Sequence, residues 1–129
     1  MKILILDDDI ERWDVVTERL KDSVDEIKWV FTAGDCIDLL CNESWDVLFL
    51  DHDLGDDNET GYDVACWLEA RPSKQPKKIY IHSLNPMGAS RMRQAITKSY
   101  CEPGIIFKLG LDENKHVCIR MYDINYKFD

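Results

Sequence analysis

The sequence predicts an α/β domain built on a parallel sheet, and two observations support this fold class. Short apolar runs alternate along the chain with segments whose apolar residues recur at helical spacing. The central runs are apolar at every position, which is typical of strands covered by helices on both faces. A chain of 129 residues with 45% hydrophobic residues is long enough for one such domain with its own core.

Five strands and four helices are expected in alternation. The strands are predicted at residues 2–6, 27–31, 47–50, 78–82 and 105–109, and the helices at 10–20, 33–42, 61–70 and 88–100. This alternation favours a flavodoxin-like, doubly wound domain with strand order 2-1-3-4-5 and helices on both faces. Residues 1–110 would form the domain and 111–129 an extension packed on it, in which residues 117–128 alternate with a period close to two.

Acidic residues follow two of the predicted strands at the edge of the sheet where such folds bind ligands. Asp7 and Asp8 end the first strand, whereas Asp51, His52 and Asp53 end the third. In the predicted strand order these two strands are neighbours, so the acidic groups should meet in space. Carboxylates crowded in this way are costly unless a cation joins them. The sequence therefore predicts a metal site.

These residues resemble those of receiver domains. Asp7 and Asp8 match the acidic end of a receiver's first strand, Asp51 its phosphorylated aspartate, Ser83 its strand-four hydroxyl and Lys108 its strand-five lysine. The motifs Asp-His-Asp-Leu-Gly (51–55), Thr-Gly-Tyr-Asp-Val-Ala (60–65) and His-Ser-Leu-Asn-Pro-Met-Gly (82–88) are similar to one divergent branch, the cyclic-phosphate-processing receiver-like domains of phages and bacteria. The resemblance spans residues 1–110 and implies action on cyclic phosphates.

Together, the residues and the resemblance suggest a metal-dependent enzyme that opens a cyclic phosphate. Mg²⁺ or Mn²⁺ would be bound by Asp7, Asp8, Asp51 and Asp53 through their carboxylate oxygens. His82 would act as general acid or base and His52 as a second base or a metal ligand, with Asp51 and Lys108 at the reacting phosphate. Substrate contacts are expected from Ser83, Asn85, Gly88, Arg91 and Arg93.

Two other functions fit the same residues. Asp51 could instead be the phosphoacceptor of a signalling receiver, or the domain could bind a cyclic nucleotide without cleaving it. The expected partner of the enzyme is a small cyclic nucleotide or the 2′,3′-cyclic phosphate at an RNA 3′ end. A net charge of −9 argues against an extended nucleic-acid surface, which requires Lys and Arg to neutralise phosphates.

The sequence also indicates where the protein functions. It contains no apolar run of about 18 residues, so a membrane span is not expected. Residues 1–7 lead directly into a strand and an aspartate and do not have the pattern of a signal peptide. A cytoplasmic location is therefore expected.

Overall fold

The computed structural model describes most of the chain. The described residues are 2–9, 14, 17–18, 21–22, 24–55, 59–81, 86–97, 105–111 and 117–121, with the backbone alone described at 86, 97, 105–111 and 117–121. Most of the helix predicted at 10–20 lies outside these residues, and the described positions within it, 14 and 17–18, are helical.

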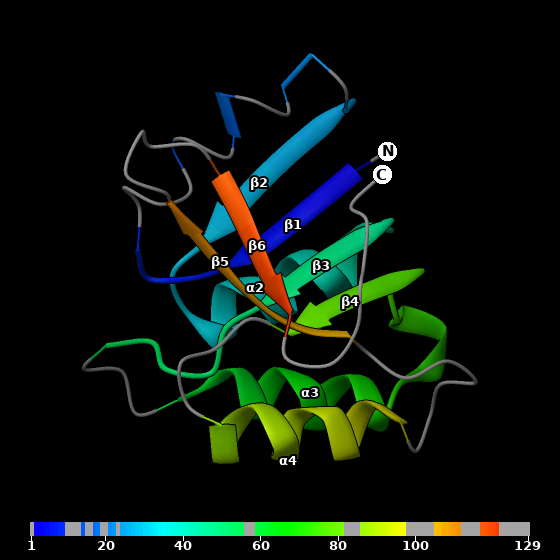
Figure 1. Cartoon of the computed structure of the whole chain (residues 1–129). Coiled ribbons are helices and arrows are strands. Elements are labelled where there is room, and N and C mark those ends of the chain that lie inside the picture. Colours follow the sequence, from blue (N-terminus) through cyan, green and yellow to red (C-terminus); the bar gives the residue numbers. More distant parts are fainter. Residues whose placement is uncertain are drawn as a thin grey trace.

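A six-stranded sheet forms the centre of the molecule (Figure 1). Its order is β2 (Glu26–Val30), β1 (Lys2–Leu6), β3 (Val47–Leu50), β4 (Lys78–Ile81), β5 (Ile105–Leu111) and β6 (Val117–Met121). The first five strands are parallel, which confirms the predicted order 2-1-3-4-5. β6 pairs antiparallel with β5, so the alternation at residues 117–121 reflects a sixth strand, and the rest of that predicted alternation, to residue 128, lies outside the described residues.

Both faces of the central strands are buried, as their uniformly apolar sequence predicts. One face joins a core cluster with the helices, and its sheet residues are Leu4, Leu6, Leu48, Leu50, Ile79 and Ile81. The other face carries Ile3, Ile5, Val47, Phe49 and Tyr80, each at most 5% exposed. On that face the rings of Phe49 and Tyr80, which are paired across β3 and β4, stack with their centroids 5.2 Å apart.

Three helices pack on the first of these faces. They are α2 (Ala33–Asn42), α3 (Gly61–Glu69) and α4 (Pro86–Thr97), and α3 lies beside α4 (Figure 1). A short 3₁₀ helix, η1 (Pro72–Lys74), follows α3. α4 begins two residues before the predicted start because Pro86 is suited to the first helical position. Among the described helices, none is both long and apolar enough to cross a membrane.

The start of α3 is fixed by side chains as well as by packing. Thr60 is the N-cap, and its hydroxyl accepts the N–H of Tyr62 at 3.2 Å. The carboxylate of Asp63 in turn accepts the N–H of Thr60 at 2.8 Å, which completes a capping box. These bonds satisfy N–H groups that the first turn of a helix leaves without partners. The loop after β3 is thereby closed at a defined residue.

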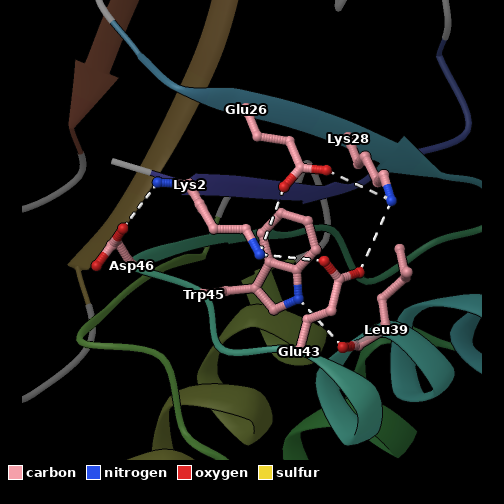
Figure 2. Close-up of polar contacts among 7 residues, drawn as sticks. All are labelled: Lys2, Glu26, Lys28, Leu39, Glu43, Trp45 and Asp46. Atoms are coloured by element: carbon pink, nitrogen blue, oxygen red, sulfur yellow. Dashed lines mark hydrogen bonds and ion pairs between the residues drawn. The ribbon is translucent and has the colours of Figure 1, made fainter.

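A network of ion pairs ties β1, β2 and α2 together at the edge of the sheet where β1 begins (Figure 2). Lys2 Nζ lies 3.1 Å from Glu43 Oε1 and 3.4 Å from Glu26 Oε2, and 4.7 Å from the centre of the Trp45 ring. The backbone N–H of Lys2 donates to Asp46 at 2.7 Å. Because Lys2 contacts all of these groups at once, it sets where the first strand begins.

Replacing Glu43 with glutamine is expected to lower the thermal midpoint slightly, and only when carboxylates are ionised. The hydrogen bond from Lys2 lowers the pKa of Glu43, so this group stabilises the fold above its ordinary pKa. The contribution is lost as the pH falls through the lowered pKa of the folded protein. Thermal unfolding of wild type and Glu43→Gln at neutral and acidic pH checks this, and 1 M salt should remove most of the difference. An equal difference at both pH values would contradict it.

Candidate functional site

The sheet brings the ends of β1 and β3 together. Leu6 pairs with Leu50, so Asp7 and Asp51 are the next residues on neighbouring parallel strands. The pairing continues into both aspartates, since Asp51 N–H donates to the carbonyl of Leu6 at 3.0 Å and Asp7 N–H to that of Val30 at 3.1 Å. The backbone of both acidic residues is therefore fixed by the sheet.

Three carboxylates meet at this point. Oxygens of Asp7, Asp8 and Asp51 all lie within 4.8 Å of one another. Asp7 is 1% exposed and Asp51 is 8% exposed, whereas Asp8 is exposed to solvent. One oxygen of Asp7 accepts the N–H of Asp9 at 2.8 Å, and Oδ1 of Asp51 accepts the N–H of His52 at 2.8 Å. We refer to Asp7, Asp8 and Asp51 as the acidic cluster.

The electrostatics of the acidic cluster favour a cation. Partial burial raises the pKa of Asp8, and the negative charge of Asp7 raises it further. Burial and a nearby negative charge both disfavour the ionised form, and a bound cation would offset both. Three carboxylate oxygens are also the donor set that a hard divalent ion such as Mg²⁺ accepts. The residues present thus fit a metal of this class.

His52 and Asp53 follow the cluster along the chain but are not part of it. Nδ1 of His52 lies 2.7 Å from Oδ1 of Asp53, so these two predicted site residues pair with each other. The His52 side chain is 16% exposed and that of Asp53 is 63% exposed. Among the described residues, the acidic cluster contains three of the four predicted metal ligands, and Asp53 is the one it leaves out.

Two glycines let the helices approach the site closely. A Cβ on Gly61, at the start of α3, would overlap the carbonyl oxygen of Asp51. A Cβ on Gly88, in α4, would overlap Cγ and Cδ2 of the His52 ring. The sequence predicts Gly88 only as a phosphate contact and Gly61 only as the start of a helix. The signal available was the position of each glycine at the start of a predicted helix, next to a strand that ends in the site.

The predicted arginines lie further along α4. Arg91 is exposed and Arg93 is partly buried. A hydrogen bond to Cys66 raises the pKa of Tyr62 on α3, and the positive charge of Arg91 opposes this shift. Arg91 therefore lies near the outer surface of α3, and its predicted contact with substrate stays a prediction.

Of the remaining predicted site residues, only the backbone of Lys108 belongs to the described part of the chain. His82, Ser83 and Asn85 lie outside the described residues. Lys108 lies in β5, two residues after Ile106, which pairs with Ile81 of β4. Its backbone is thus at the same edge of the sheet as the acidic cluster, but β5 continues to Leu111, so Lys108 lies within the strand and not at its end as predicted.

Solved structures show the same fold. The phosphorylated cyanobacterial phytochrome response regulator RcpA is 19% identical, with a TM-score of 0.62 over 73% of this chain and 74% of that one. TrrA from Thermotoga maritima, solved in complex with Mg²⁺-BeF, is 19% identical, with a TM-score of 0.60 over 73% and 79%. A CheY-like receiver domain from Methylobacillus flagellatus is 20% identical, with a TM-score of 0.56 over 68% and 73%.

The comparison with protein-family models gives a more specific result than the comparison with solved structures. A comparison with curated proteins found no match. The model of the cyclic-phosphate processing receiver domain, in contrast, matches residues 2–98, which include β1 to β4 and all three described α-helices. The matched segment contains the whole acidic cluster together with His52 and Gly88. The chain therefore belongs to the family of cyclic-phosphate processing receiver domains.

Proposed function

We propose that this protein opens a cyclic phosphate ester with the help of a divalent cation held by the acidic cluster. The observation that carries the proposal is the gathering of three carboxylates, followed directly in the chain by His52, at the edge of the sheet where ligands of this fold bind. The family match supports a cyclic phosphate as the substrate class. A bound Mg²⁺ or Mn²⁺ would neutralise the phosphoryl oxygens.

The proposed site residues have three tasks: binding the cation, transferring protons and contacting the phosphate. Asp7, Asp8 and Asp51 hold the cation, and TrrA, a structural relative solved with Mg²⁺-BeF, supports this assignment. His52 and His82 serve proton transfer, which suits imidazoles near neutral pH. Lys108 neutralises charge on the phosphate, and the further contacts to substrate come from Ser83, Asn85, Gly88, Arg91 and Arg93.

The proposed substrate is a small cyclic nucleotide or a 2′,3′-cyclic phosphate at an RNA 3′ end. Both present one doubly esterified phosphate, which a single cation can bind. With a net charge of −9, the protein would repel long stretches of nucleic-acid backbone. Binding is therefore expected to depend on the reacting end of the molecule and on the metal, and not on the length of the strand.

Phosphorus NMR tests this proposal. Wild type with Mg²⁺ or Mn²⁺ is incubated with a panel of 2′,3′-cyclic and 3′,5′-cyclic nucleotides, beside Asp51→Asn, His82→Ala and the exposed control Asp38→Asn on α2. One ring should open in wild type and in the control, and the rate should fall by about 10²-fold or more in the other two variants. Absence of turnover across the panel would overturn the proposal, and broadening of one ligand's signal would then identify a binder.

A second candidate function is phosphoacceptance by Asp51. RcpA, a structural relative, was solved in its phosphorylated form, and Asp51 is held in the acidic cluster at the end of β3. Incubation with acetyl phosphate and Mg²⁺, followed by intact mass measurement, would show one added phosphoryl group that Asp51→Asn does not acquire. Labelling without turnover of any cyclic phosphate would favour this function over the first.

A further inference from the structure

The imidazole of His52 is held from several directions at once. Its Nδ1 lies 2.7 Å from Oδ1 of Asp53. The ring lies against Gly88 of α4, where an added Cβ would be 2.7 Å from Nδ1 and would overlap Cγ and Cδ2. The backbone is fixed as well, because His52 N–H donates to Asp51 and the His52 carbonyl accepts Gly61 N–H at 3.0 Å.

This arrangement defines which ring nitrogen is available. A carboxylate beside Nδ1 favours the tautomer with its proton on Nδ1, because only that form donates to Asp53. Nε2 then carries the lone pair. The ring atoms nearest to a Cβ added at Gly88 would be Cγ, Cδ2 and Nδ1, so Nε2 lies farther from that position than these three atoms do. Within the described part of the chain, Nε2 has no hydrogen-bond partner.

We propose that Asp53 is a positioning residue for His52 and not a metal ligand, and that Gly88 provides the space in which the ring is seated. Among the described residues, Asp53 is outside the group of carboxylates that lie within 4.8 Å of one another. Its carboxylate is also far more exposed than those of Asp7 and Asp51. The pair works as carboxylate–histidine pairs do elsewhere, where the carboxylate fixes tautomer and ring direction.

The catalytic part of this inference rests on the proposed function. Nε2 of His52 takes a proton from the attacking water while the water oxygen forms a bond to phosphorus. The ring P–O bond breaks, and the leaving oxygen takes a proton from a donor, for which His82 is the candidate. His52 then returns its proton to solvent. The sum is one cyclic diester and one water converted to a monoester with a free hydroxyl.

Nitrogen NMR of the imidazoles tests the positioning role without any substrate. The full chain is labelled with ¹⁵N-histidine, and the His52 signals are assigned by their loss in His52→Gln. Wild type should show the Nδ1–H tautomer, and Asp53→Ala should shift His52 toward the Nε2–H form. Gly88→Ala should displace the signals, whereas Ser90→Ala, at an exposed position of the same helix, should not. An unchanged tautomer in Asp53→Ala would overturn the inference.

Metal binding and kinetics supply two independent readouts. The affinity for Mn²⁺, measured from the electron paramagnetic resonance signal of the unbound ion, should be the same for Asp53→Ala as for wild type within about twofold. Asp51→Asn should lose Mn²⁺ binding. A tenfold loss in Asp53→Ala would make Asp53 a ligand and contradict the proposal.

On a cyclic phosphate that wild type opens, kcat of Asp53→Ala should fall about 10²-fold with little change in KM, and Asp53→Glu should recover part of it. Failure of wild type to turn over would count against the proposed function alone, since the tautomer and Mn²⁺ measurements still decide the role of Asp53.

Discussion

Replacing Gly61 with alanine is expected to destabilise the protein by about 2–4 kcal/mol. The new Cβ would overlap the carbonyl oxygen of Asp51 and lie 2.8 Å from its carbonyl carbon and 2.9 Å from Sδ of Met92. Neither the backbone at Gly61 nor the backbone at Asp51 can move freely to relieve this overlap. Gly61 N–H is bonded to the carbonyl of His52, and Asp51 N–H is bonded to the carbonyl of Leu6 in the neighbouring strand.

Urea unfolding of Gly61→Ala beside Gly34→Ala measures the effect. Gly34 is the second residue of α2, and a Cβ there would have no atom within 4 Å. Gly34→Ala is therefore expected to stabilise the protein by up to about 1 kcal/mol, through the higher helix propensity of alanine. If both variants unfolded at the same urea concentration, the close approach of α3 to β3 would not matter to stability.

The arrangement of the sheet could be predicted because it depends on patterns that are visible along the sequence. Strands such as residues 47–50 are apolar at every position, and residues 61–69 carry apolar groups at helical spacing between two clear boundaries. Once strands one and three are neighbours, Asp7 and Asp51 must lie side by side. The acidic cluster followed from strand order alone, without knowledge of any side-chain conformation.

The separate roles of Asp51 and Asp53 could not be predicted, because they depend on the directions of the side chains. Asp51 and Asp53 have the same side chain, and the sequence assigned both to the metal. Because β3 ends at Leu50, strand alternation does not fix the directions of the side chains of His52 and Asp53. Asp53 pairs with His52, and the ring of His52 is seated on Gly88 of α4, which is distant in sequence.

The extra strand at the sheet edge has a similar explanation. A period of two after residue 117 indicated extended structure, but a strand can pair with either edge or with none. Which strand β6 pairs with, here β5 through pairs such as Leu109 with Ile119, is not written in the residue pattern of β6.

Adding Mg²⁺ is expected to raise the free energy of unfolding by about 2.7 kcal/mol at a concentration one hundred times the dissociation constant. The reason is that only the folded protein brings Asp7, Asp8 and Asp51 to within 4.8 Å of one another. Without the cation, partial burial and then the negative charge of Asp7 raise the pKa of Asp8, so three ionised carboxylates are costly here. Asp51→Asn removes one of the three charges, so it should be at least as stable as wild type in EDTA.

Thermal unfolding in EDTA and in a Mg²⁺ series separates the two effects. The midpoint of wild type should rise with Mg²⁺ concentration, whereas that of Asp51→Asn should stay constant, because a site with one carboxylate fewer binds the ion far more weakly. Asp38→Asn, at an exposed position of α2, has the same change in charge and should respond to Mg²⁺ as wild type does. A wild-type midpoint that does not change with Mg²⁺ concentration, or an equal rise in Asp51→Asn, would show that the acidic cluster holds no ion.

The comparison with Asp38→Asn matters because a cation also screens a protein of net charge −9 in a general way. Only a difference between the two asparagine variants assigns the stabilisation to the ends of β1 and β3.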